Sequence, residues 1–150
     1  MLSNYRLEKL VGLQKKLNYN FNDNLLLNKA LSHKSYVHET DESLKNNERL
    51  EFLGDSVLDL IVSFYTVKFY TSHNEGTLSK IRAAVVNEQC LSDLARNICL
   101  GEYLLLGRGE ELSGGRNKRS ILANTFEAVV GAVYFDSNFE LETRLEQRHK

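Results

Sequence analysis

One long apolar segment limits the folds open to this chain more than any other feature of its sequence. It runs from about Asn47 to Tyr70 and is apolar on almost every side when it is wound as an α-helix. A helix without a broad polar face is typical of the centre of a core, because every side of it has to be covered. The segment therefore predicts a helix that is buried in the core.

Composition favours more helices. None of the 150 residues is proline, and proline breaks helices because it lacks an N–H and clashes with the preceding turn. A genome with biased codon use would give the same result in a sequence this rich in Asn, Lys and Leu. A chain of 150 residues, 42% of them apolar, has the size and composition of one globular domain.

Two classes of protein are excluded by simple counts. No apolar run reaches the roughly 18–20 residues of a membrane span, and the N-terminus has no signal-peptide core. The two cysteines, Cys90 and Cys99, match neither a disulfide framework nor a zinc site. We therefore expect a cytoplasmic protein that does not enter a membrane.

The spacing of apolar residues predicts the other elements. Gly101 suits the left-handed position that ends a helix. Helices are expected over about 4–17, over 22–31 with a cap at 22 or 23, over about 120–135 and over 138–149. The segment 77–100 is expected to form two consecutive helices that meet at a cap at Asn87. Loops are expected over 33–45 and 107–118, and 103–106 is the one short strand candidate. The fold class is all-α.

Charge is distributed unevenly along the chain. Residues 1–38 carry six basic and two acidic side chains, residues 39–60 carry two basic and seven acidic ones, and the remaining ninety residues are neutral overall. An acidic block beside basic stretches can hold a metal ion in one place and a polyanion in another. Ordinary solvated helix faces would give the same pattern.

Three carboxylates of the acidic block interrupt the most apolar segment. Glu48, Glu51 and Asp55 are spaced i, i+3 and i+7, which places them on one face of a helix. Carboxylates among apolar neighbours are costly unless they are paired or bound to a metal. Glu48 alone is also explained as a first-turn acid favoured by the helix dipole.

A second apolar helix adds oxygen ligands to this set. Asn124 and Glu127 are spaced i and i+3 on it, so four or five oxygen ligands converge if the two helices cross. An all-oxygen site suits Mg²⁺ or Mn²⁺ rather than zinc. Gly54 inside the first helix costs about 1 kcal/mol relative to alanine, which is tolerable if something packs closely against the backbone there.

The segment Asn47–Asp55, NERLEFLGD, resembles the signature of the ribonuclease III family. The similarity extends over essentially the whole chain, with further motifs in the family's order: His33-Lys34-Ser35, Glu75-Gly76, Leu78-Ser79-Lys80 with Arg82, Gly114-Gly115, Ile121-Leu122-Ala123 and Glu127-Ala128. The resemblance implies an all-helical, homodimeric endonuclease domain that cleaves double-stranded RNA with Mg²⁺, for which Mn²⁺ can substitute. Its products would carry 5′-phosphates, 3′-hydroxyls and two-nucleotide 3′ overhangs, in rRNA and mRNA processing.

The resemblance also assigns roles to single residues. Asp55, Glu127 and Glu48 match catalytic acids, and Glu51, Asn124, Glu127 and Asp55 match the metal ligands. Phe52 matches an aromatic residue that fills a socket on the partner subunit, and Glu75 matches an accessory metal position.

Basic residues are needed to bind RNA, because an acidic cluster repels it. A-form RNA is recognised mainly by shape, through its phosphates and 2′-hydroxyls. The candidate contacts are Lys34, Lys80, Arg116, Lys118 and Arg119. For each of them, a solvated surface charge without a role in RNA binding is an equally good explanation.

Two departures from the family pattern bear on activity. Position 124 is usually aspartate in the family and is Asn124 here, which keeps an oxygen ligand but loses a charge. The alternative is therefore a weakened or inactive ribonuclease III fold that binds double-stranded RNA as a scaffold, although such a protein has no physical reason to keep costly acids. Typical bacterial members also carry a double-stranded-RNA-binding domain after residues equivalent to 1–150, so we expect this chain to be one nuclease domain from a longer protein.

A carboxylate-bridged di-iron bundle is a third possibility. It would need Glu-x-x-His pairs on two helices, and the sequence has only one such pair, Glu146 and His149. This class is therefore excluded.

Overall fold

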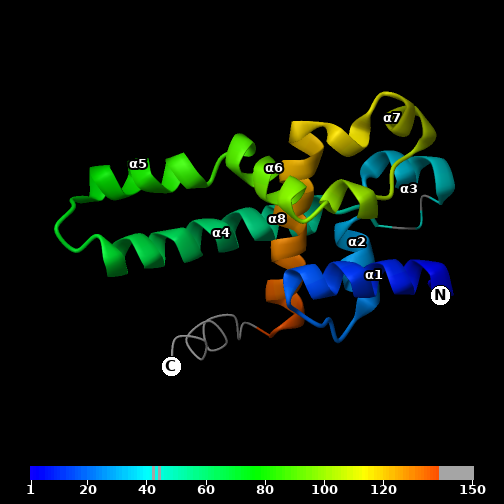
Figure 1. Cartoon of the computed structure of the whole chain (residues 1–150), viewed down its shortest axis with the longest axis horizontal. Coiled ribbons are helices and arrows are strands. Elements are labelled where there is room, and N and C mark those ends of the chain that lie inside the picture. Colours follow the sequence, from blue (N-terminus) through cyan, green and yellow to red (C-terminus); the bar gives the residue numbers. More distant parts are fainter. Residues whose placement is uncertain (42, 44, 139–150) are drawn as a thin grey trace.

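The computed structural model describes residues 1–138 except 42 and 44, and every regular element in this part of the chain is helical (Figure 1). The all-α prediction is confirmed. The α-helices are α1 (Asn4–Leu17), α2 (Asn24–Ala30), α3 (Lys34–Thr40), α4 (Glu48–Phe69), α5 (Glu75–Val85), α6 (Glu88–Asn97), α7 (Arg108–Leu112) and α8 (Arg119–Asp136); the 3-10 helices are η1 (Leu100–Tyr103) and η2 (Gly115–Asn117). The helix predicted over 138–149 lies outside the described residues, apart from its first position.

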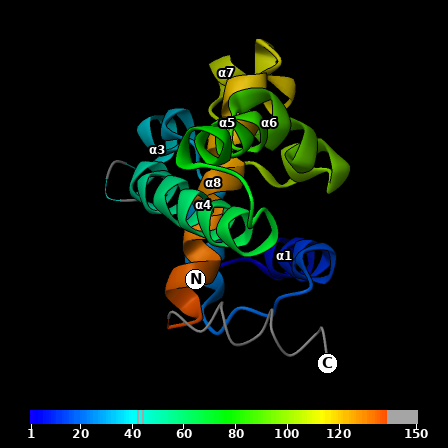
Figure 2. The same cartoon turned by 90° about the vertical axis from the view of Figure 1, so that its left-hand side faces the viewer.

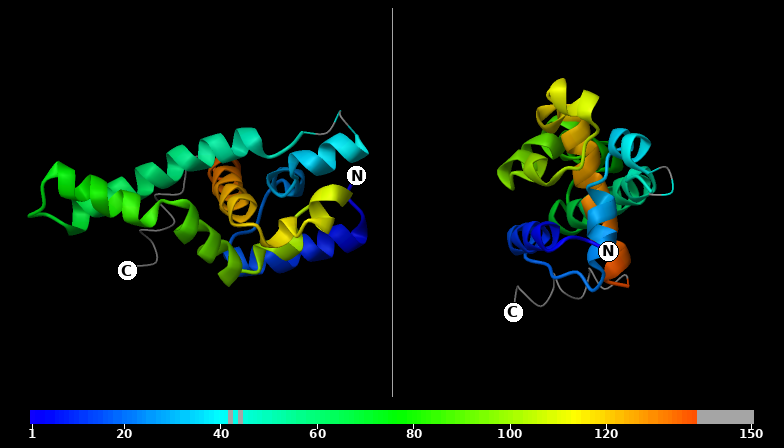
Figure 3. Two further views of the ribbon diagram at one scale, coloured as in Figure 1. Left: turned by 90° about the horizontal axis from the view of Figure 1, so that it is seen from above. Right: turned by 90° about the vertical axis from the view of Figure 1, so that its right-hand side faces the viewer.

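The most completely buried helix is α8, whereas α4, which the sequence predicted to be buried in the core, is buried only in part. In Figure 3 (left) α8 lies between α4 on one side and α6 on the other, and it packs against both of them and against α2. The buried residues of α8 run along its whole length, from Ile121 to Asp136. By contrast, α4 buries only Leu50, Gly54, Val57 and Thr66.

The reason for this difference is the length of α4. Its second half extends away from the body of the molecule beside α5 (Figures 1 and 2). Its apolar side chains there stay largely exposed, because no third helix among the described residues covers them. The exposed large apolar residues of α4, α5 and the turn between them are Phe52, Leu60, Phe64, Val67, Phe69, Tyr70 and Val85.

Both predicted loops contain short helices. The segment predicted as a loop over 33–45 forms α3, because the His33 side chain accepts a hydrogen bond from the Ser35 N–H and caps the helix. The glycine-rich loop contains α7 and η2, and the Glu39 carboxylate accepts a hydrogen bond from the backbone N–H of Arg108 at the start of α7. The strand predicted at 103–106 is reduced to one isolated bridge between Ser32 and Leu105.

Gly101 does not have the left-handed conformation that was predicted for it. Cys99 has that conformation instead, with φ of 53°, and Gly101 lies inside η1. A Cβ at Gly101 would overlap the carbonyl oxygen of Arg116. The glycine is therefore needed for a close backbone approach, and not for the turn.

Two buried polar side chains fix the ends of the helices that carry the candidate site. Asn47, the first residue of the NERLEFLGD segment, donates a hydrogen bond to the carbonyl of Ala30 and so ties the start of α4 to α2. Asp136 accepts hydrogen bonds from the Tyr19 hydroxyl and from the backbone N–H groups of Asn22 and Asp23, which ties the end of α8 to the α1–α2 connection. In the described part of the chain, no helix combines the length and the apolar character that crossing a membrane requires.

Candidate active site

The carboxylates are brought together where α4 and α8 cross. A Cβ at Gly54 would overlap the carbonyl oxygen of Glu127, and a Cβ at Gly131 would overlap that of Leu50. The two helix backbones are thus in direct contact, which supplies the close packing under which a glycine is tolerable at position 54. The crossing places Glu127 of α8 next to the stretch of α4 that carries Glu51 and Asp55.

Electrostatics confirm that these three side chains are neighbours. Burial and, after it, the negative charges of Asp55 and Glu51 together raise the pKa of Glu127 to about 7 from its ordinary 4.5. Burial and the charges of Glu48 and Asp55 likewise raise the pKa of Glu51. The group therefore resists carrying its full negative charge without a cation nearby.

Two further charged residues lie close to this group. Asp59 also raises the pKa of Glu127, and sequence reasoning missed it although it lies one helical turn after Asp55. Lys34 of α3 acts in the opposite direction and lowers the pKa of Glu51. Lys34, predicted as an RNA contact, is thus a neighbour of the carboxylates as well.

The other residues to which the resemblance assigned catalysis or metal binding are all exposed. Glu48 is exposed in the first turn of α4, where the helix dipole favours an acid. Asn124 is exposed on α8, one turn before Glu127. Glu75 lies at the start of α5 and accepts a hydrogen bond from the Ser79 hydroxyl, and Figure 1 shows this end of α5 far from α8.

The donor set fits a hard divalent cation, since it consists of carboxylate oxygens whose charges repel one another. No three or more Asp, Glu, His or Cys side chains within residues 1–138, apart from 42 and 44, are already arranged to hold a metal ion. Metal binding by Glu51, Asp55, Asn124 and Glu127 therefore stays a prediction.

The predicted RNA-binding residues are spread over several elements. The Arg116 guanidinium is used inside the protein: it donates hydrogen bonds to the carbonyls of Gly101 and Leu104 and forms an ion pair with Glu111 at 2.6 Å. Lys118 pairs with Glu110, and Arg119 lies 3.9 Å from Glu88. Lys80 is exposed on α5.

Comparison with known proteins identifies the architecture. A family model described as ribonuclease-III-like matches residues 23–148. The chain belongs to the ribonuclease III family. It is 53% identical to Ribonuclease 3 of Borreliella afzelii over 94% of this chain and 58% of that protein. It is 51% identical to Ribonuclease 3 of Fusobacterium nucleatum over 89% of this chain and 58% of that protein. The chain thus spans about 58% of the length of these curated ribonuclease III relatives.

A solved ribonuclease III structure has the same fold. The nuclease domain of ribonuclease III from Campylobacter jejuni superimposes with a TM-score of 0.82 and 42% identity, over 91% of this chain and 92% of that one. That structure is described as showing structural flexibility in a region involved in dimer formation. The predicted ribonuclease III nuclease-domain fold is confirmed for this chain.

Proposed function

We propose that this chain is the nuclease domain of a cytoplasmic, Mg²⁺-dependent ribonuclease III that cleaves double-stranded RNA. Its products would have 5′-phosphate and 3′-hydroxyl ends with two-nucleotide 3′ overhangs, and its substrates would include rRNA and mRNA precursors. The observation that carries this proposal is the contact of α4 with α8 at Gly54 and Gly131, which brings Glu51 and Asp55 to Glu127.

Hydrolysis of a phosphodiester needs an activated water, a polarised phosphoryl group and help for the leaving 3′ oxygen. Divalent metal ions supply all three when they are bound. Glu51, Asp55 and Glu127 would hold such ions, and Asn124 would add a neutral amide oxygen. Glu127, with a pKa of about 7, gains or loses a proton at its carboxyl group near neutral pH. Asp55 is exposed beside it and would orient water.

The RNA would be bound by Lys34, Lys80, Lys118 and Arg119. These side chains would contact its phosphates rather than its bases. We leave Arg116 out of this set, because its guanidinium already bonds to two backbone carbonyls and to Glu111. Recognition through phosphates and 2′-hydroxyls makes binding depend on the A-form shape of the duplex.

A direct assay separates this proposal from the scaffold alternative. The protein is incubated with a perfectly paired RNA duplex, once with Mg²⁺ and once with EDTA, and the products are resolved by size. Fragments with Mg²⁺ alone support the nuclease. Binding of the duplex without fragments under both conditions supports the alternative of an inactive scaffold that binds double-stranded RNA. A DNA duplex of the same sequence is the control for specificity toward RNA.

We further propose that the active form is a homodimer. One carboxylate cluster per subunit cuts both strands with a fixed stagger only if a twofold-related copy is present. Phe52 is 80% exposed, and α4 carries further exposed apolar side chains from Leu60 onward. An apolar surface of this kind is typical of a protein–protein contact.

Phe52→Ala is expected to weaken dimerisation by tenfold or more. Removing a buried phenylalanine from an interface loses about 1.5–3 kcal/mol of hydrophobic free energy, and about 1.4 kcal/mol corresponds to tenfold in affinity. Sedimentation equilibrium measures the change. Phe135→Ala is the matched control, since Phe135 is also exposed but lies near the end of α8. A wild-type protein that is monomeric and fully active would contradict the proposal.

Asn124→Asp is expected to lower the Mg²⁺ concentration for half-maximal cleavage by about tenfold. An added negative charge beside a divalent ion at low effective dielectric is worth more than the roughly 1.4 kcal/mol that equals one decade. Without metal, the added acid repels Glu51, Asp55 and Glu127 and slightly lowers the melting temperature. Mg²⁺ titrations of both proteins measure this, and overlapping curves would show that residue 124 is not a ligand.

A further inference from the structure

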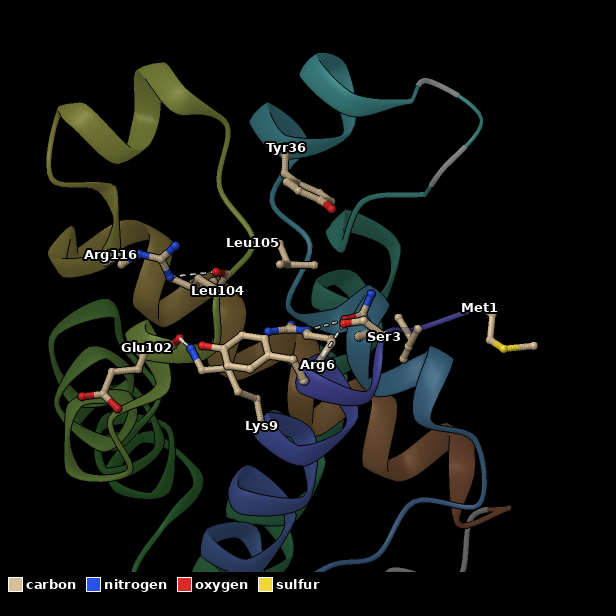
Figure 4. A pocket seen from close by; sticks show the side chains of 12 residues that line it. Met1, Ser3, Arg6, Lys9, Tyr36, Glu102, Leu104, Leu105 and Arg116 are labelled. Carbon is tan, nitrogen blue, oxygen red and sulfur yellow. Dashed lines mark hydrogen bonds between the residues drawn. The ribbon is translucent and has the colours of Figure 1, made fainter.

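A second candidate site lies apart from the carboxylates, in a pocket of about 700 Å³ whose walls come from α1, α2, α3 and η1. Figure 4 shows the side chains of Arg6, Lys9, Tyr36 and Arg116 around this pocket. Three of its lining residues are thus cationic, and Glu102 is the single acidic one among the described residues that line it. None of these residues belongs to the proposed nuclease site.

Arg6 carries the strongest observation in the pocket. Its Nε donates a hydrogen bond of 2.7 Å to the Asn28 side-chain oxygen. Its Nη2 is buried and has no hydrogen-bond partner among the residues that the structure describes. A buried donor without an acceptor destabilises the folded protein, and more so when the group is charged. The described residues supply no acceptor, so an acceptor from outside would remove this cost.

The electrostatic surroundings of Arg6 favour an anion as that acceptor. Burial lowers the pKa of the Arg6 guanidinium, and the positive charge of Arg116 acts in the same direction. The Lys9 ammonium donates to the carbonyl of Glu102 at 2.9 Å, which leaves its other N–H groups for a further acceptor. A small anion would satisfy Arg6 Nη2 and reduce the repulsion between the two guanidinium groups.

The walls of the pocket indicate the size and kind of ligand. A volume of about 700 Å³ is within the roughly 300–1,000 Å³ of small-molecule sites and well above the need of a bare ion. Tyr36 and Leu105 provide aromatic and apolar surface beside the cationic groups. A guanidinium pairs well with phosphate through parallel hydrogen bonds, and an ammonium adds a point charge.

We propose that this pocket binds a phosphate monoester of nucleotide size, with the phosphate at Arg6 and Lys9 and the organic part against Tyr36 and Leu105. The proposal rests on the orphaned Arg6 donor and on the shape of the pocket, and it does not depend on the nuclease activity. The carboxylates of α4 and α8 play no part in it.

Calorimetric titration with two probes tests the proposal. Adenosine 5′-monophosphate and inorganic phosphate are each titrated into the protein at low salt with EDTA present, so that divalent ions are removed. We expect saturable binding of the nucleotide, at least tenfold tighter than that of phosphate. Arg6→Gln should weaken nucleotide binding by tenfold or more. Lys15→Gln should leave it unchanged, since Lys15 is an exposed cation of the same helix that does not line the pocket.

Several outcomes would overturn the proposal. The proposal is wrong if the protein shows no saturable nucleotide binding, or if it binds the nucleotide and phosphate with equal affinity. It is also wrong if Arg6→Gln binds the nucleotide with unchanged affinity, or if only duplex RNA binds in a competition assay. Because Arg6 is partly buried, Arg6→Gln could fail to fold. In that case Lys9→Gln replaces it, with a several-fold loss of nucleotide affinity expected. If Lys9→Gln then bound the nucleotide with unchanged affinity, this result would contradict the proposal.

Discussion

Glu127→Gln is expected to abolish cleavage of double-stranded RNA while leaving binding of the duplex nearly intact. The substitution keeps the size of the side chain but removes the charge that attracts a divalent ion, and it touches no proposed phosphate contact. We expect cleavage to fall by at least about a hundredfold, which corresponds to about 2.7 kcal/mol of transition-state stabilisation. Single-turnover cleavage and a gel-shift assay in Ca²⁺ or EDTA measure the two properties separately.

Glu8→Gln is the control for this experiment, because it makes the same chemical change at an exposed glutamate of α1. If Glu127→Gln lost binding and cleavage in parallel, the carboxylate would be a part of the RNA-binding surface and the proposed site would be wrong. If cleavage persisted, the crossing of α4 and α8 would not be the catalytic centre.

The raised pKa of Glu127 gives the same variant a second readout that does not depend on RNA. Its pKa is about 7 in the folded protein against an ordinary 4.5, so folding favours the protonated carboxyl. This contribution to stability is fully present below pH 4.5 and is lost as the pH rises to about 7. Glutamine does not titrate. With EDTA present, Glu127→Gln should therefore have a higher melting temperature than wild type at pH 8. At pH 4.5 and below, the two proteins should have the same melting temperature.

The sequence predicted the fold class and most helices because periodicity and caps act locally. The predicted cap Asn87 does accept a hydrogen bond from the Cys90 N–H at the start of α6. The more complete burial of α8 than of α4 could not be predicted in this way. Apolar residues on all sides of a helix indicate that it is covered, but they do not say whether its own chain covers it. On the second half of α4, several of these apolar side chains are exposed.

For the candidate site, sequence spacing was informative within each helix and silent between helices. It grouped Glu51 with Asp55 on one face, and it marked Gly54 as a position for close packing. It missed the neighbours that come from elsewhere, such as Lys34 of α3, because α3 was predicted as a loop. It also assigned Arg116 to RNA by its charge alone. Tertiary structure places the backbone carbonyls to which Arg116 donates its hydrogen bonds. This placement cannot be predicted from the residue type at position 116.

Gly54→Ala is expected to destabilise the protein by about 3 kcal/mol or more, because the added methyl group would overlap the carbonyl oxygen of Glu127. For a chain of this size, this lowers the melting temperature by about 6–12 °C, at roughly 2–4 °C per kcal/mol. In an ordinary helix interior, the same change stabilises by up to about 1 kcal/mol. The sign of the effect therefore tests whether the two backbones touch.

Gly12→Ala provides the matched control, since Gly12 lies inside α1 and its added Cβ would meet only the Tyr103 hydroxyl at an ordinary 3.6 Å. We expect it to raise the melting temperature slightly, while Gly54→Ala lowers it. The contact at Gly54 also sets the distance between Glu127 and the carboxylates of α4. Any Gly54→Ala protein that still folds should therefore lose cleavage as well, through separation of the charges. A Gly54→Ala protein as stable and active as Gly12→Ala would show that the crossing does not hold the site together.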